Sequence, residues 1–181
     1  MADSHKGIIL LTLARNAIAS HFGQPTKPVE TPGWLNEPGA TFVTLTQQGS
    51  LRGCIGSLEA HRPLGMDVQQ NALAAAFRDP RFTPLSESEL TRTSVEVSLL
   101  SPQEPLAFTD EADALAKLRP GEDGIVFENG SYRSTFLPQV WAQLPTPRQF
   151  MAHLKRKAGL SENFWSPEVR LHRYTVEKWK E

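Results

Sequence analysis

Cys54, the single cysteine among the 181 residues, lies in the strand-like segment 51–56 between two glycines, Gly53 and Gly56. Glycine inside a strand loses backbone entropy on folding and offers no side chain to pack, so these positions indicate a close approach of another group to the backbone. Strand alternation places Arg52, Cys54 and Gly56 on one face, with Arg52 about 7 Å from the cysteine at Cα. A nearby guanidinium favours the thiolate, and the pattern therefore predicts a nucleophilic cysteine or one that contacts a ligand.

The same cysteine also fits a second interpretation, a small buried core residue, which is a common role of free cysteine. A cysteine nucleophile normally needs a base, and Glu59 and His61 follow the strand closely. His61 returns toward the strand if the chain turns before Pro63, so we take it as the candidate base. The candidate catalytic residues are Cys54, Arg52, Glu59 and His61, and the candidate binding residues on this segment are Gly53, Gly56 and Ser57.

A second polar group, Arg78, Asp79 and Arg81, follows the end of a predicted helix. In a structural interpretation, cations there complement the helix dipole and Asp79 braces an arginine. In a functional interpretation, the same residues bind a carboxylate or phosphate of a small molecule. We keep the three as further candidate binding residues.

The remaining chemistry-bearing residues predict neither a metal site nor a cofactor. The histidines show no pair at helix or strand spacing, and one cysteine cannot form a zinc framework. The glycine–cysteine segment also lacks the lysine and the strand–loop–helix context of a phosphate-binding loop. A single cysteine permits no internal disulfide and fits a reducing compartment, so we expect a cytoplasmic protein. The five histidines are His5, His21, His61, His153 and His172.

Charge and hydropathy exclude several partner classes. The net charge of −1 is too small for a broad nucleic-acid or anionic-lipid footprint, and the basic run 155–157 is short. No apolar run approaches the ~20 residues that span a bilayer. Near the N-terminus, apolar residues with a 3.6-residue period favour an amphipathic helix over a signal peptide. We therefore expect no nucleic acid and no membrane among the partners.

The elements that must position these residues can be predicted along the chain. Strand 40–47 and the segment 51–60 form a hairpin, and Pro63 begins a helix that reaches position 77. Strict alternation predicts strand 94–100. Because strands come in hairpins among helices, we predict an α+β fold with a mainly antiparallel sheet flanked by helices. Further predicted elements are a short turn or helix at 87–90, helices at 109–118, 138–144 and 146–158, strands at 124–128 and 132–136, and a last strand at 169–176.

Several segments in fixed order resemble the AMMECR domain family, also called protein A of the AmmeMemoRadiSam system. The resemblance covers nearly the whole chain, and its multi-residue motifs make it specific. The matching segments are 51–56, 74–82 with 84–85, 95–102, 118–121, 123–124, 136–141 and 157–160.

The resemblance implies a larger and a smaller lobe in one compact unit over residues 1–181, with the smaller lobe within about 84–145. It implies that the strand around Cys54 lines an active or binding cleft, while the family's activity is uncharacterised. The chain departs from the family at Lys155, where relatives often carry a second cysteine. This departure excludes a two-cysteine redox pair or a metal site shared by two cysteines.

Two functions remain open. The chain is either an enzyme that uses Cys54 on a small-molecule substrate, or a non-catalytic module that binds a small molecule or a protein partner. The resemblance implies two partners by association: a Memo-type protein, which resembles extradiol dioxygenases, and a radical SAM protein.

Overall fold

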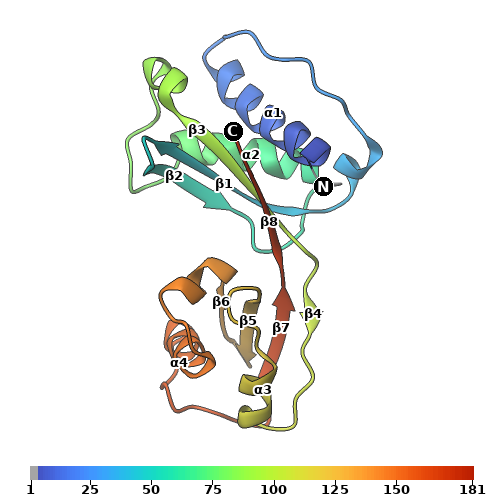
Figure 1. Cartoon of the computed structure of the whole chain (residues 1–181), viewed down its shortest axis with the longest axis vertical. Helices are drawn as coiled ribbons and strands as arrows, with labels where there is room; N and C mark the ends of the chain where they lie inside the picture. The colour runs from blue at the N-terminus through green and yellow to red at the C-terminus, as the bar shows by residue number, and fades with distance from the viewer. Residues whose placement is uncertain (1–3) are drawn as a thin grey trace. The chain divides into compact units, whose positions relative to one another are not determined.

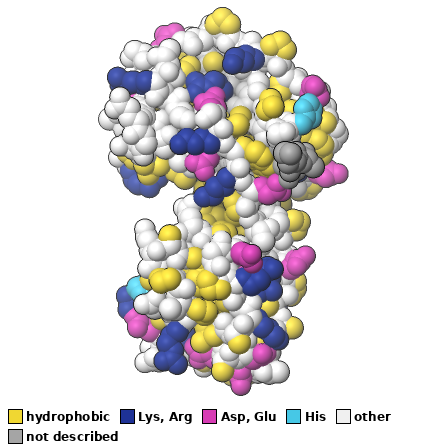
Figure 2. Space-filling model, in the orientation of Figure 1, with side chains coloured by type: hydrophobic (Ala, Val, Ile, Leu, Met, Phe, Trp, Pro, Cys, Tyr) yellow, Lys and Arg dark blue, Asp and Glu magenta, His cyan; other side chains and the backbone are white. Residues whose placement is uncertain are grey.

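The structure is a computed structural model that describes residues 4–181, and the chain divides into two compact units (Figure 1). The first unit comprises the described residues up to Leu100 together with Glu177–Glu181, and the second comprises Ser101–Val176. None of the helices formed by residues 4–181 has the length and apolar character needed to cross a membrane. In the space-filling view, basic and acidic side chains are interspersed over the visible face of each unit (Figure 2).

The first unit is a four-stranded sheet with two helices on one face. Its strands follow the order β2-β1-β3-β8, and β1 pairs antiparallel with both β2 and β3. Its elements are α1 (Ser4–His21), η1 (Gly33–Asn36), β1 (Ala40–Gln47), β2 (Ser50–Gly56), α2 (Leu64–Phe77), η2 (Glu87–Arg92), β3 (Ser94–Leu100) and β8 (Val176–Lys180).

The core of the first unit forms because alternate strand residues meet the apolar faces of both helices. Val43 and Leu45 of β1 and Val97 of β3 are fully buried, as are Ile18 of α1 and Val68 of α2. The helices α1 and α2 pack against each other, α2 packs on β1 and β2, and α1 packs on β3. Thr44, which lies between Val43 and Leu45 in β1, therefore faces away from the helices.

The second unit has its own sheet, in the order β4-β7-β5-β6, with antiparallel neighbours. Its core surrounds Phe127, Phe150 and Trp141, and the last two rings stack at 3.9 Å between centroids. Gly130 has a positive φ of 60° in the turn that joins β5 and β6. The elements are β4 (Glu104–Pro105), α3 (Glu111–Lys117), β5 (Gly124–Asn129), β6 (Tyr132–Phe136), η3 (Pro138–Ala142), α4 (Pro147–Lys157) and β7 (Arg170–Tyr174).

The predicted α+β class is confirmed, while several elements differ from the sequence prediction, three of them by more than a few residues or in type. The second hairpin arm ends at Gly56 rather than at 60, and the helix predicted at 138–144 is the short 3-10 turn η3. The strand predicted at 169–176 is two strands of different sheets, β7 and β8, separated at Thr175. The resemblance implies a smaller lobe within about 84–145. The second unit of the structure is Ser101–Val176, and β7 pairs with β5 inside its sheet.

Candidate functional site

Cys54 lies in β2, directly opposite Thr44 of β1. Its side chain is partly exposed, and the Cys54 sulfur lies 3.3 Å from the Thr44 hydroxyl oxygen. Because Val43 and Leu45 point to the helices, Cys54 and Thr44 share the opposite face of the sheet. Glu96 of β3 pairs with Thr44 on its other side and continues the same row. The thiol therefore belongs to the face of the sheet that α1 and α2 do not cover.

The main chain of Cys54 is held on its outer edge by two side chains from the segment after α2. The Cys54 N–H donates to Oδ2 of Asp79 at 2.9 Å, and Nη2 of Arg81 donates to the Cys54 carbonyl at 3.2 Å. Since β2 is an edge strand, these groups have no neighbouring strand to pair with. We call this arrangement the Asp79–Arg81 clamp.

The two members of the clamp also bind each other. Nε and Nη2 of Arg81 donate to the Asp79 carboxylate at 3.0 and 2.7 Å, and the Arg81 N–H donates to it at 3.1 Å. Asp79 is 4% exposed, whereas the Arg81 side chain is 56% exposed. The Arg81 hydrogen bonds hold the pKa of Asp79 far below its usual range, against the opposing effect of burial. Asp79 in turn raises the pKa of Arg81. The clamp thus presents one face of an ionised, oriented guanidinium to solvent.

Arg52 does not share the face of Cys54, which corrects the sequence prediction. The β1–β2 register pairs Gly53 with Leu45 and Leu51 with Thr46, so Arg52 is the extra residue of a β-bulge. Its guanidinium donates to the Glu89 carboxylate of η2 at 2.8 and 3.2 Å. The bulge resets the alternation and turns the Arg52 side chain away from the thiol.

Glu89 gathers the polar groups on this side of β2. Nε2 of Gln47 donates to Glu89 at 2.9 Å, and Gln47 continues the alternation of Val43 and Leu45 onto the helix side. The Arg52 hydrogen bonds are the largest cause of a Glu89 pKa far below its usual range. Nη1 of Arg52 is buried and has no hydrogen-bond partner among the described residues. Arg52 therefore connects β2 with η2.

Both glycines of the cysteine strand make room for groups of the protein itself. A Cβ on Gly53 would overlap the carbonyl oxygen of Ala75 in α2, and a Cβ on Gly56 would overlap the ring of Phe42. The close approach predicted from these glycines is therefore made by helix backbone at Gly53 and by an aromatic ring at Gly56. The packing accounts for both glycines without a ligand.

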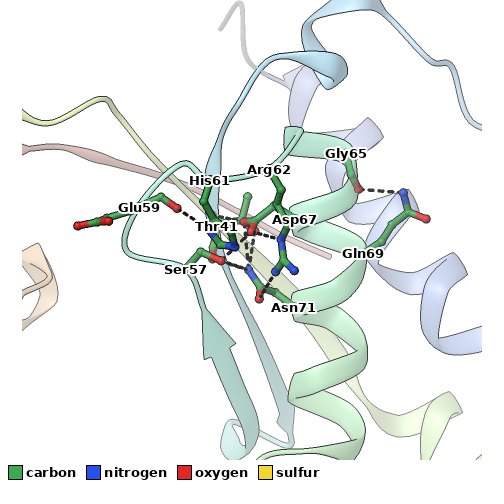
Figure 3. Close-up of polar contacts among 9 residues, drawn as sticks. All are labelled: Thr41, Ser57, Glu59, His61, Arg62, Gly65, Asp67, Gln69 and Asn71. Carbon is green, nitrogen blue, oxygen red and sulfur yellow. Dashed lines mark hydrogen bonds and ion pairs between the residues drawn. The ribbon is translucent and has the colours of Figure 1, made fainter.

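Ser57 belongs to a buried polar cluster at the end of the hairpin (Figure 3). Its hydroxyl donates to Oδ1 of Asp67 at 2.6 Å, and Nε of Arg62 donates to the same oxygen at 2.8 Å. The other oxygen of Asp67 accepts bonds from the N–H and hydroxyl of Thr41 at 2.8 and 2.7 Å, and from the Asn71 amide at 3.1 Å. This cluster connects β1 and the segment after β2 to α2, and it accounts for Ser57 structurally.

Glu59 and His61 lie in the exposed loop between β2 and α2 (Figure 3). Nδ1 of His61 lies 3.0 Å from the Glu59 carbonyl oxygen. The group that contacts the Cys54 sulfur is instead Thr44. Arg78 is exposed at the end of α2, and its side chain has no hydrogen bond or ion pair with residues 4–181.

The structure thus brings Asp79 and Arg81 to Cys54, and it adds two residues that the sequence reasoning missed, Thr44 and Phe82. The centre of the Phe82 ring lies 5.5 Å from the guanidinium carbon of Arg81 and 5.9 Å from that of Arg52. The turn between the two strand-like segments was enough to predict that β1 pairs with β2. The bulge, however, decides which residue of β1 lies opposite Cys54. In the described part of the chain, no three His, Cys, Asp or Glu residues are grouped so that they could hold a metal ion.

Comparisons with known proteins give the class of this protein. A crystal structure of an uncharacterized protein from Pyrococcus horikoshii matches it with a TM-score of 0.80 and 32% identity, over 97% of this chain and 91% of that one. The shared fold defines an α+β protein of the same architecture as that archaeal one.

The sequence comparisons go one step further. A family model described as AMMECR1 matches residues 11–179. A protein of Methanothermobacter thermautotrophicus is 36% identical over an alignment 181 positions long, gaps included, that covers 97% of this chain and 94% of that protein. A protein of Thermotoga maritima is 37% identical over 159 residues, which cover 87% of this chain and 86% of that one. The chain belongs to the AMMECR1 family.

Proposed function

We propose that the chain binds a small molecule with an anionic group at the edge of β2. The Cys54 thiol loses its proton to water, and the sulfur then attacks an electrophilic carbon of that molecule and displaces a leaving group, which departs with the bonding electron pair. The observation that carries the proposal is the Asp79–Arg81 clamp, which fixes the cysteine main chain and orients a solvent-exposed guanidinium beside it. Any pair of polar side chains could hold the main chain of Cys54. An exposed guanidinium, in addition, offers hydrogen-bond donors to a carboxylate or phosphate.

The geometry divides the work among three side chains. Asp79 stays ionised and holds Nε and Nη2 of Arg81, so that Nη1, which has no partner among the described residues, is free for the anion. Thr44 is within hydrogen-bonding distance of the sulfur and orients it. A single free thiol fits reducing surroundings, and we place this function in the cytoplasm.

Alkylation with matched reagents tests the proposal. The folded protein is treated with anionic iodoacetate or neutral iodoacetamide, and modification of Cys54 is followed by mass spectrometry. We expect the ratio of the iodoacetate rate to the iodoacetamide rate to be several-fold higher for Cys54 than for a cysteine in an unstructured peptide. Arg81→Gln removes the guanidinium and should abolish this preference. Arg78→Gln removes an equal charge from the same segment and should leave it unchanged.

Two results would overturn the proposal. One is an identical reagent preference in wild type and Arg81→Gln. The other is modification of Cys54 only under denaturing conditions. Arg81→Lys keeps the positive charge, so it should retain part of the preference if that charge is the cause. This variant therefore distinguishes loss of the charge from loss of the β2 structure.

A second candidate function is protein docking, and the exposed apolar side chains in β2 and just beyond it favour it. Leu51 shares the face of Cys54 and is 43% exposed, and Leu58, just beyond β2, is 41% exposed. The family resemblance makes a Memo-type protein and a radical SAM protein the partners to try. Loss of such a complex in Leu51→Glu, with the alkylation preference unchanged, would favour docking over chemistry at the thiol.

A further inference from the structure

A pocket of about 680 Å³ lies within the second unit, well separated in sequence from the cysteine strand. It is lined by the first turns of α3, by α4 and by residues 162–165. Its walls combine charged side chains of both signs with apolar surface from Leu115 and Trp165. Nothing in the proposed chemistry of Cys54 uses these residues.

Lys155 forms the floor of the pocket and is almost completely buried, with 1% of the residue exposed. Its ammonium donates to Oε1 of Glu111 at 2.5 Å and to the carbonyl of Glu162 at 3.2 Å. The nitrogen also lies 5.4 Å from the centre of the Trp165 ring. A buried lysine needs such partners, because an unpaired charge is costly away from water. Lys155 and Glu111 therefore neutralise each other and fix α4 to α3.

Two charged groups in the lining are left over after this pairing. The Arg148 guanidinium is exposed and makes no hydrogen bond or ion pair with the described residues. The Asp110 carboxylate uses Oδ1 to accept the Asp113 N–H at 2.8 Å, and its other oxygen has no partner among the described residues. The carboxylate of Glu162 is bound to Arg156. The pocket thus offers one available positive and one available negative group.

We propose that this pocket binds a free amino acid with an apolar side chain. Arg148 would donate two hydrogen bonds to the carboxylate, in the two-point geometry that a guanidinium favours. Asp110 would bind the ammonium group, assisted by the second oxygen of Glu111. The side chain of the amino acid would lie against Leu115 and the face of Trp165. A ligand with a single charge would leave either Arg148 or Asp110 unmatched in the occupied pocket, and a zwitterion matches both.

Titration calorimetry with three related probes tests the charge requirement on the full chain. L-phenylalanine carries both charges, N-acetyl-L-phenylalanine lacks the ammonium, and L-phenylalaninamide lacks the carboxylate. We expect L-phenylalanine to bind at least tenfold more tightly than either derivative. Equal affinity for one of the derivatives, or no binding of L-phenylalanine at millimolar concentration, would overturn the proposal.

Variants assign the binding to this pocket. Arg148→Gln and Asp110→Asn should each weaken L-phenylalanine binding at least tenfold, and asparagine preserves the helix cap at position 110 because it is an equally good capping residue. Arg170→Gln, which removes an exposed arginine of β7 outside the pocket, should leave the affinity unchanged. Unchanged affinity in Arg148→Gln would contradict the proposal.

A structural readout separates this site from that of Cys54. In the NMR spectrum, the indole N–H signal of Trp165 is identified as the one that is absent from Trp165→Phe. Addition of L-phenylalanine to the wild type should shift this signal. Cys54→Ser should bind L-phenylalanine as the wild type does. Loss of binding in Cys54→Ser would contradict an independent site in the second unit, whereas failure of the alkylation experiment would leave this result unaffected.

Discussion

At the residue scale, Gly53 marks a point of close contact between β2 and α2. The backbone carbonyl of Ala75 occupies the space that a Cβ at position 53 would need. A backbone atom within a helix cannot move aside as a flexible side-chain end can, so the cysteine strand depends on this glycine for its position on the helix.

Gly53→Ala is therefore expected to destabilise the protein. Overpacking of a well-packed interior costs about 1–3 kcal/mol, and we expect a loss in this range or above it, measured by urea unfolding. Gly33→Ala is the control, because nothing lies within 4 Å of a Cβ at that position. A loss of stability as large in Gly33→Ala as in Gly53→Ala would show that the close approach to Ala75 is not the cause.

The Asp79–Arg81 clamp makes stability depend on pH in a definite direction. Because the folded state holds the pKa of Asp79 far below its usual value, the ionised carboxylate stabilises the fold at pH values above the unfolded pKa, near 4. This contribution decreases progressively as the pH falls below that value and toward the lowered pKa of the folded state. Asp79→Asn should cost about 1.5–3 kcal/mol of unfolding free energy at pH 7, the range for a hydrogen bond to a charged group.

The difference between wild type and Asp79→Asn should shrink when the same urea titrations are repeated near pH 3. Subtraction of the two proteins cancels the other carboxylates, which titrate in both. A difference that is equally large at pH 3 and pH 7 would assign the effect to packing rather than to the charge of Asp79.

At the element scale, α1 and β8 meet at Gly7 and Trp179. A Cβ on Gly7 would overlap the indole ring of Trp179. In an ordinary helix interior, replacement of glycine by alanine stabilises by about 1 kcal/mol. At position 7 we expect the opposite sign, because the methyl group would displace the ring that covers the helix.

Thermal unfolding of four proteins checks this expectation. Gly7→Ala should lower the melting temperature, and Trp179→Leu should lower it by loss of burial. In the double variant, the alanine should raise the melting temperature relative to Trp179→Leu alone. An additive result, with alanine equally harmful in both backgrounds, would rule out the contact with Trp179 as the cause.

The elements also show what the sequence could predict and what it could not. Strand β3 has the predicted bounds, because the alternation of its sequence sets Val95 and Val97 on the buried side. The predicted face of Arg52 was wrong. Without a bulge, pairing outward from the turn at 48–49 would set Val43 opposite Cys54. The extra residue in β2 shifts the register, so that Thr44 lies opposite Cys54 instead. A bulge is decided by tertiary packing, and no periodicity in the sequence records it.

The same distinction holds for the candidate site. The segment 78–81 follows α2 directly, and the interpretation in which Asp79 braces an arginine matches the observed pair with Arg81. The contact of this pair with the edge of β2 spans 25 residues of sequence and depends on how α2 packs. His61 is near Cys54 in sequence, but the chain after Gly56 leaves the strand and ends in the Asp67 cluster through Arg62.

At the scale of the whole molecule, each unit has its own core and its own sheet. The second unit is a single continuous segment, and all four strands of its sheet lie within it. We therefore expect residues 101–176, expressed by themselves, to fold and to unfold cooperatively, as followed by circular dichroism and dispersed amide NMR signals. Residues 101–169, which lack the inner strand β7, should fail both tests. A disordered spectrum for residues 101–176 would contradict an independent core.

The first unit is assembled differently, because β8 joins its sheet after the chain has passed through the whole second unit. During synthesis on a ribosome, residues 4–100 emerge first but cannot complete their sheet, and the outer edge of β3 stays unpaired until β8 has left the exit tunnel. A single residue separates β7 from β8, so the sheet of the second unit is completed at the same late stage. A chain halted by a stalled ribosome before position 176 would thus display an open edge on β3, the kind of surface on which chaperones and aggregation compete.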